Sequence, residues 1–224
     1  MTAQEHFNTM VKEHVAPFMK QQGFKKSGTS WGLRGRELWG VVALWRETWN
    51  TESLVNFSIT LGVAFDCLTK HDGFRFVESR IPSSGHTHWH AAVGKSEARR
   101  IAEGRSDVHE RRLRITTASD IEPVGEWVVH VLHRIAIPKI RRRRNIESFI
   151  EMYESSKKNP LGWDDHRFAV LMLHAGRTEQ AHKLFVKSLR EHLDHPSYAW
   201  RVKKLAELGL DAAAIEREAR QEPA

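Results

Sequence analysis

The sequence predicts an α+β protein in which an N-terminal helix packs on an antiparallel sheet of four to six strands, followed by an all-helical C-terminal region. Two observations carry this prediction. Residues 38–65 alternate between two faces with a period of two, which is typical of half-buried strands. From Asp120 onward, apolar residues instead recur at spacings of three and four, the stripe of an amphipathic helix. The sheet therefore comes first along the chain and most of the helices follow it.

The first predicted element is an amphipathic helix over residues 3–21. Thr2 is a suitable N-cap, and Gly23 is a suitable C-terminal stop. Pro17 lies inside the pattern and is expected to kink or divide the helix. The apolar stripe consists of Phe7, Met10, Val11, Val15, Phe18 and Met19.

The predicted sheet is built around a long antiparallel hairpin over residues 38–65, with a polar turn at residues 49–53. A short strand around Trp31 precedes the hairpin, and residues 112–117 form the expected last strand. Between them, residues 66–92 are read as a long loop with a short strand at 74–78, and a short helix is expected from Ser96. One face of the second hairpin strand carries Val55, Phe57, Ile59, Leu61, Val63 and Phe65.

The helical part begins with an N-cap at Asp120, and Pro138 is expected to end or kink its first helix. The strongest breaker in the sequence is the run at residues 157–162, which contains Pro160 and Gly162. We therefore divide the chain into an α+β domain at residues 1–158 and a C-terminal helical subdomain at residues 159–224. Residues 171–189 resemble one helical hairpin of the tetratricopeptide type, although a stacked array needs several copies.

Length and composition fit a globular protein of one large domain or two small ones. No apolar run reaches the roughly 20 residues that cross a bilayer, and the N-terminus lacks the apolar core of a secretory signal. Cys67 is the single cysteine, so no intrachain disulfide can form, which favours the cytoplasm. The net charge of +7 arises within residues 1–158 and permits an anionic partner such as nucleic acid.

The order of several motifs resembles a known family. Gly-Phe-Lys-Lys at residues 23–26 follows the first helix, and an aromatic strand at Trp31 comes next. A Trp-containing strand and the strand Asn-Phe-Ser-Ile-Thr-Leu-Gly-Val at residues 56–63 then precede the helices. This order resembles the bacterial domain of unknown function 4304 over roughly residues 5–155. The resemblance implies the fold and transfers no catalytic residues. Some members are thought to neutralise toxins, which implies an immunity-type role as one hypothesis.

The sharpest candidate for chemistry is a set of three alternating histidines, His86, His88 and His90. In an extended chain, residues two apart point the same way, so the three imidazoles would converge. Three neutral histidines are a known zinc-binding set with an open position for water, which suits a metal-dependent hydrolase. The competing interpretation is that these are solvated loop histidines.

Basic residues form the second candidate. Arg141 and Arg144, within the run at residues 139–145, would share one side of a helix, and Lys25, Lys26 and Arg34 precede the central hairpin. Such residues bind nucleic acid or an acidic surface, whereas a solvated helix face is the simpler account of the run.

Aromatic residues form the third candidate. Arg34, Arg36 and Arg46 lie among four tryptophans, and such a mixture stacks single-stranded bases in some proteins. The tryptophans are Trp31, Trp39, Trp45 and Trp49. Trp39 and Trp45 share a face with Val41 and Ala43, which favours the sheet core for both. Trp49, beside the turn, is the one expected to be partly exposed.

An enzyme is the less favoured class, because the sequence has no nucleophile elbow, P-loop, dinucleotide fingerprint or HExxH motif. The leading hypothesis is a non-enzymatic module that binds a protein partner, for which an acidic surface would suit the basic chain. The first alternative is binding of RNA or single-stranded DNA through the basic N-terminal domain. The second alternative is the metal-dependent hydrolase.

Overall fold

The computed structural model describes residues 1–73, 80–93, 108–109, 112–162 and 164–221. The predicted short strand at 74–78 and the predicted helix from Ser96 lie outside the described residues. The chain divides into two compact units, the first from residues 1–65 and 76–144 and the second from residues 66–75 and 145–224. Each unit is considered by itself.

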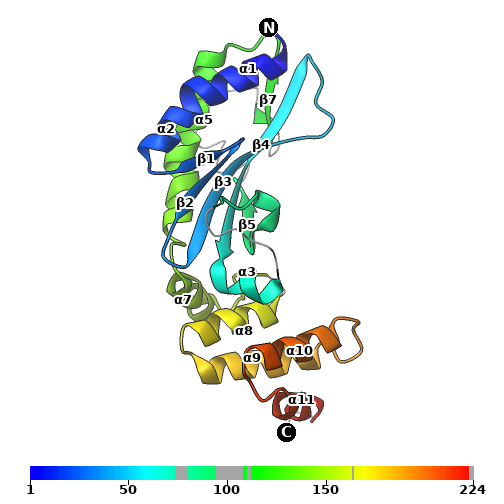
Figure 1. Cartoon of the computed structure of the whole chain (residues 1–224). Helices are drawn as coiled ribbons and strands as arrows, with labels where there is room; N and C mark the ends of the chain where they lie inside the picture. Colours follow the sequence, from blue (N-terminus) through cyan, green and yellow to red (C-terminus); the bar gives the residue numbers. More distant parts are fainter. Residues whose placement is uncertain (74–79, 94–107, 110–111, 163, 222–224) are drawn as a thin grey trace. The chain divides into compact units, whose positions relative to one another are not determined.

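The first unit contains an antiparallel sheet (Figure 1). Six described strands follow one another in the order β1-β2-β3-β4-β7-β6, and a seventh, β5, also pairs with β4. The strands are β1 (Lys25–Ser27), β2 (Ser30–Arg34), β3 (Leu38–Arg46), β4 (Leu54–Phe65), β5 (Trp89–Ala92), β6 (Val108–His109) and β7 (Arg112–Thr116). The sheet followed by helices confirms the predicted α+β class.

The predicted central hairpin is the pair β3 and β4, in register from Leu38 opposite Phe65 to Arg46 opposite Phe57. Two strands pair with the other edge of the long strand β4. Strand β7 pairs with its first residues and β5 with residues 60–63. Side chains directly opposite each other in an antiparallel pair lie on the same face. The predicted apolar face of β4 is therefore also the face of Val42, Leu44 and Arg46 on β3.

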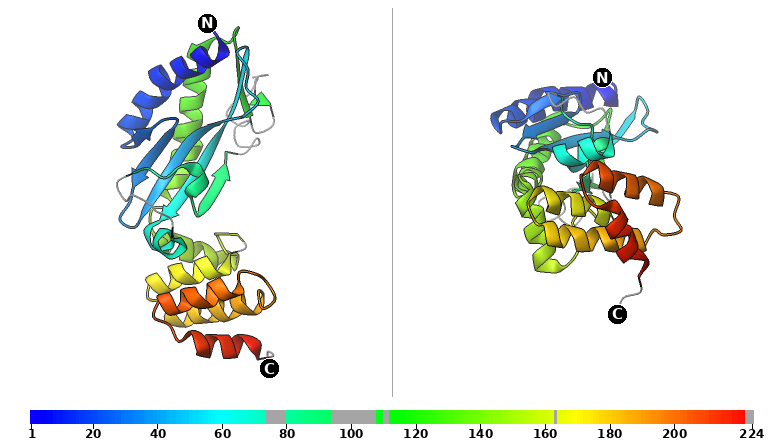
Figure 2. Two further views of the ribbon diagram at one scale, coloured as in Figure 1. Left: turned by 45° about the vertical axis from the view of Figure 1, so that its right-hand side comes forward. Right: turned by 60° about the horizontal axis from the view of Figure 1, so that its bottom comes forward.

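Two helical segments cover this face of the sheet, one from each end of the unit's sequence (Figure 2). The first consists of α1 (Ala3–Met10), η1 (Val11–Val15) and α2 (Ala16–Gln21), and the second of α5 (Ile121–Val131), η3 (Leu132–Ala136) and α6 (Ile137–Arg141). Phe7 of α1 packs edge-on against Phe57, with ring centroids 5.1 Å apart. Trp31 and Phe57 are completely buried in this core.

Both helical segments pass through a proline without ending. Pro17 and Pro138 each lie in the first turn of an α-helix that directly follows a five-residue π-helical stretch. A π-turn changes the helical hydrogen-bonding pattern locally, and in both segments the helix continues past a proline, which lacks a backbone N–H. The expectation that Pro138 ends or kinks its helix is met only by this local change, since the helix continues to Arg141.

The other face of the sheet has a smaller apolar cluster, in which Trp39, Val41 and Ala64 are buried beneath Ile81. Gly62 of β4 adjoins this cluster, and a Cβ atom placed there would lie 2.6 Å from the Thr87 hydroxyl oxygen. The segment around residues 81–87, which includes η2 (Ser84–His86), therefore covers the middle of this face closely.

The second unit is helical in its described part. It consists of α3 (Asp66–Asp72), α7 (Ile146–Ser156), α8 (Asp165–His174), α9 (Thr178–Arg190), α10 (Tyr198–Glu207) and α11 (Ala212–Arg220). Helices α8 and α9 form the expected helical hairpin around the Gly176 turn. The division into units differs from the predicted boundary after residue 158, because Tyr153 of α7 packs on Phe168 of α8 at 5.0 Å and α3 joins the same unit.

Candidate functional site

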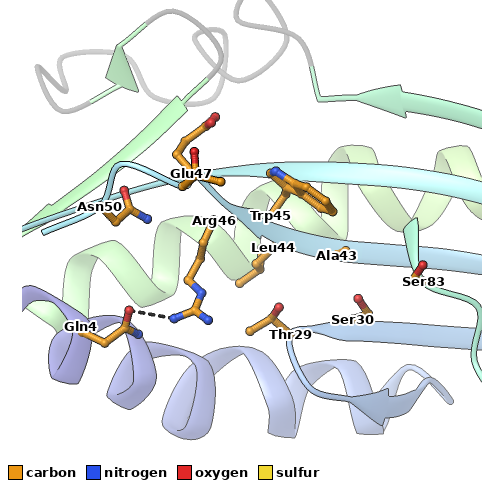
Figure 3. A pocket seen from close by; sticks show the side chains of 11 residues that line it. Gln4, Thr29, Ser30, Ala43, Leu44, Trp45, Arg46, Glu47, Asn50 and Ser83 are labelled. Carbon is orange, nitrogen blue, oxygen red and sulfur yellow. Dashed lines mark hydrogen bonds between the residues drawn. The ribbon is translucent and has the colours of Figure 1, made fainter. Parts of the chain in front are cut away.

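An open pocket of about 420 Å³ lies at the end of β3 that leads into the hairpin turn (Figure 3). Its volume falls within the range of about 300–1,000 Å³ that is usual for ligand sites. Helix α1 contributes Gln4, the turn between β1 and β2 contributes Thr29, β2 contributes its first residue, Ser30, and β3 contributes its last residues. The remaining lining residues are Glu47, Thr48, Asn50 and Ser83.

Arg46 is the cation of this pocket. One of its terminal nitrogens donates a hydrogen bond of 2.7 Å to the amide oxygen of Gln4, and its guanidinium lies 5.7 Å from the centroid of the Phe7 ring (Figure 3). The side chain is exposed, and no carboxylate of a described residue forms an ion pair with it. A guanidinium has five N–H donors, so most of its capacity remains available to a ligand.

Two tryptophans beside the pocket are exposed, Trp45 by 51% and Trp49 by 56%. The exposure of Trp49 was predicted, whereas the prediction of a core position for Trp45 is wrong. Trp45 does share a face with the buried Trp39, but Ile81 covers that face only near Trp39. Trp45 is therefore half exposed, on the part of this face that lies beyond Ile81.

The hairpin turn next to the pocket is held by side-chain and backbone bonds. The amide of Asn50 donates to the carbonyl of Asn56 at 3.0 Å, and the Asn56 N–H donates to the Asn50 side-chain oxygen at 2.7 Å. The N–H of Ala3 donates to the carbonyl of Glu52 at 2.7 Å, which ties the start of α1 to the turn. These bonds fix the relative positions of Gln4, Arg46 and the turn.

The predicted basic residues gather at the opposite end of the sheet. Arg141 donates to the backbone and side-chain oxygens of Gln22, at 3.3 and 3.1 Å, three residues before Lys25. The carbonyl of Arg144 lies beside Gly35, in the turn that follows Arg34. We call Lys25, Arg34, Arg141 and Arg144 the basic corner.

The predicted basic residues of β1 and β2 do not all face the same way. Lys25 pairs with Gly32, so it shares a face with Arg34, which lies over the Trp39 ring, whereas Lys26 belongs to the other face. Within the described part of the chain, no ion pair neutralises Lys25, Arg141 or Arg144. Trp49, predicted with these residues as a binding group, lies at the other end of β3.

The basic run is not one helix, contrary to the expectation that Arg141 and Arg144 share a helical face. Helix α6 ends at Arg141, and a turn separates it from α7. Asn145 caps α7 by accepting a hydrogen bond of 3.0 Å from the N–H of Ser148. Arg143 points back along the chain, where it donates to the Lys139 carbonyl and lies 4.3 Å from the Trp89 ring.

The three predicted metal ligands do not converge in the described structure. His86 ends a 3₁₀ turn, so the extended geometry assumed for residues 86–90 does not hold, and its Nδ1 lies 2.7 Å from the Ser83 hydroxyl. The Nδ1 of His88 accepts a hydrogen bond of 2.9 Å from the Phe65 N–H. His90 is exposed on β5. Among the described residues, no group of three or more His, Cys, Asp or Glu side chains is arranged to hold a metal.

The second unit contains a buried pair of histidines, His71 of α3 and His166 of α8. The rings of His71 and His166 lie 5.1 Å apart, and both contact Trp200 at 5.7 Å. Burial lowers the pKa of His71 to about 4 and that of His166 to about 2, so both rings are neutral at pH 7. Neither ring nitrogen of His166 has a hydrogen-bond partner among the described residues.

Ion pairs surround this histidine pair. Arg167 lies 3.0 Å from a carboxylate oxygen of Asp72 and 3.2 Å from one of Asp164. Burial nevertheless raises the pKa of Asp72, because the loss of hydration outweighs the attraction of Arg167. Buried Arg201 donates to the Ser188 hydroxyl at 3.0 Å and extends the same network. These groups form a packed polar core inside the second unit.

Comparison with known proteins identifies the family of the chain. A family model described as domain of unknown function (DUF4304) matches residues 15–138, which is more than half of the chain. The chain belongs to the DUF4304 family. The match confirms the resemblance drawn from the Gly-Phe-Lys-Lys motif and the strand at residues 56–63. No curated protein and no solved structure was found to match.

The DUF4304 match begins in η1 and ends in α6, so it contains the pocket residues from Thr29 to Ser83 but not Gln4. The basic corner is split, because Lys25 and Arg34 lie inside the match while Arg141 and Arg144 follow it. The family description names no activity that could be transferred to the pocket. None of the described helices is both long and hydrophobic enough to span a bilayer.

Proposed function

We propose that this DUF4304 protein is a non-enzymatic, cytoplasmic binding module that takes a protein partner at the hairpin end of its sheet. The observation that carries the proposal is the exposure of Trp45 and Trp49, by 51% and 56%, beside an arginine at an open pocket. We call Trp45, Arg46, Trp49 and the pocket the hairpin surface.

The composition of the hairpin surface supports a protein partner. Tryptophan and arginine are the residue types most enriched among those that dominate binding energy at protein interfaces, where they fill or line central pockets. Arg46 is held by Gln4 and Phe7, so little side-chain freedom is lost when a partner binds. The positive net charge favours an acidic surface on the partner, because opposite potentials speed and orient docking.

Substitution of Trp45 by alanine is expected to weaken binding of the partner by about 30-fold, the effect of losing roughly 2 kcal/mol at a central interface residue. The partner is first identified by cross-linking and co-purification with the full chain, and its Kd is then measured by calorimetry for each variant. Arg36→Ala, an exposed arginine at the opposite end of β3, is the matched control and should leave Kd unchanged. Equal affinity of Trp45→Ala and the unaltered protein would contradict the proposal. For the immunity-type version, the same variant should also lose rescue of growth from a toxin encoded beside this protein.

A second candidate function is binding of RNA or single-stranded DNA, which the basic corner favours. Four cations from β1, β2, the end of α6 and the turn after α6 lie at one end of the sheet, and three of them have no ion pair with a described residue. Phosphate contacts by such residues release counterions, so affinity falls as salt rises.

For an oligouridine probe, the double variant Arg141→Gln and Arg144→Gln is expected to lower the slope of log K against log salt by about 1.4, which corresponds to roughly 0.7 for each lost single-strand phosphate contact. Filter binding between 50 and 200 mM salt measures this slope. The control is Lys183→Gln with Lys203→Gln, two exposed lysines of the helical unit. Absence of binding at the lowest salt would eliminate this candidate.

A further inference from the structure

Strand β3 extends past the end of its neighbour β2. The ladder between them stops at Ser30 opposite Ala43, followed by one more bond of 2.9 Å from the Leu44 N–H to the Thr29 carbonyl. The chain then turns away through Gly28, which has a positive φ of 59°. The last part of β3 is thus an open sheet edge that borders the pocket (Figure 3).

The alternation of hydrogen bonds along β3 shows which of its backbone N–H and C=O groups face this open edge. The bond from Leu44 to Thr29 shows that even-numbered residues of β3 direct their N–H and C=O toward β2. The bond of 3.1 Å from the Glu47 N–H to the Asn56 carbonyl shows that odd-numbered residues face β4. Arg46 is even, so its N–H and C=O point into the space beyond Thr29, where no described strand pairs with them.

The side chains on either side of this edge differ in chemistry. Arg46 projects onto the helix-covered face, where Gln4 and Phe7 hold its guanidinium without an opposing carboxylate among the described residues. Trp45 projects onto the other face, where it is half exposed. The edge therefore combines a main-chain donor and acceptor with a cation on one face and an indole on the other.

We propose that the open edge of β3 binds an extended acidic peptide segment of the partner, which pairs with Arg46 as an added strand in line with β2. The residue opposite Arg46 carries a carboxylate that the guanidinium binds, because directly opposite side chains share a face. Its neighbour projects onto the other face and packs an apolar side chain against Trp45. Main-chain bonds supply affinity and the alternate side chains supply specificity, as in other cases of strand addition.

This proposal rests on the proposed function and specifies the partner's binding segment. A nucleic-acid strand would use Arg46 and Trp45 as well, but it has no main chain that alternates a donor and an acceptor in the manner of a β-strand. The unused N–H and C=O of Arg46 therefore favour a peptide.

Selection from a displayed library of random octapeptides against the full-length chain tests this inference. We expect enrichment of peptides in which Asp or Glu lies next to an aliphatic or aromatic residue. A synthetic copy of an enriched peptide should lose about ten-fold in affinity with Arg46→Gln, and again with Trp45→Ala, while Arg36→Gln should bind as the unaltered protein does. Enrichment of peptides that bind all of these variants equally would overturn the inference, and so would the absence of any enrichment.

The pairing itself has a separate readout. Binding of the peptide should slow hydrogen exchange of the Arg46 amide, and N-methylation of the peptide amides flanking the acidic residue should abolish binding. A peptide that binds as a helix, or an oligouridine that protects Arg46 instead, would refute strand addition. If a folded partner is bound in a manner that depends on Trp45 and yet no peptide binds, the proposed function stands and this inference fails. If neither depends on Trp45, both fail.

Discussion

At pH 5 the second unit is expected to be about 2 kcal/mol less stable than at pH 7 through His166 alone, since its folded pKa is about 2 and its unfolded value about 6.5. A buried neutral histidine disfavours the proton in the folded state, whereas the unfolded chain accepts it readily. The contribution is therefore fully present above pH 6.5, and it is lost progressively as the pH falls toward the folded pKa. His71, with a folded pKa of about 4, acts in the same direction over the same interval.

Asp72 and three nearby cations also affect how the stability of the second unit depends on pH. The raised pKa of Asp72 works in the opposite sense, because a carboxyl that is protonated more readily when folded gains relative stability as the pH falls. The positive charges of Arg167, Arg201 and Lys204 each oppose protonation of one or both histidines.

The test is urea unfolding at pH 5 and pH 7, followed through the NMR amide signals of α8 and α9 so that the helical unit alone is measured. His166→Leu should lose the 2 kcal/mol dependence and should also be more stable at pH 7, because it removes two buried ring nitrogens that lack described partners. His174→Leu, on the exposed end of the same helix, is the matched control. An unchanged pH dependence in His166→Leu would show that this ring is not the buried neutral group.

Phe57→Ala is expected to destabilise the first unit by about 3–5 kcal/mol, the usual cost of truncating a large buried aromatic side chain. Phe57 has no exposed surface and packs edge-on against Phe7, so the change would open a cavity between β4 and α1. Ser58→Ala tests the neighbouring residue on the opposite face and should change stability by no more than about 0.5 kcal/mol.

Urea unfolding followed through amide signals of β3 and β4 measures both variants. The comparison tests the face assignment, since a one-residue shift of register would exchange the roles of these two positions. Similar losses for both variants would show that the assignment of faces is wrong.

The period of two in residues 38–65 was sufficient to predict the hairpin and its two faces, because alternation is a local property of the chain. It was not sufficient to predict the exposure of Trp45. That depends on where the covering segment at Ile81 stops, and this segment comes from a region that the sequence indicates only as loop. Alternation determines the face of a side chain, whereas the cover over that face is set by distant residues.

The pocket was missed although one signal for it was present. The strand around Trp31 was expected to be short and β3 long, and unequal neighbouring strands leave part of an edge unpaired. Gln4, which completes the pocket, comes from a helix whose contacts with β3 no local pattern reveals. The basic run was read as one helix even though Asn145 is a strong N-cap residue, and in the structure it begins α7.

The place of α3 in the chain has a consequence for how the protein can be shortened. This helix follows β4 directly, yet it belongs to the compact unit formed by residues 145–224. A truncation after Arg144 would keep α3 but remove α8, whose Arg167 contacts Asp72 and whose His166 packs against the buried His71. The residues matched by the DUF4304 model likewise include α3 and exclude α8. The matched segment excised by itself would therefore leave Asp72 and His71 of α3 without these contacts.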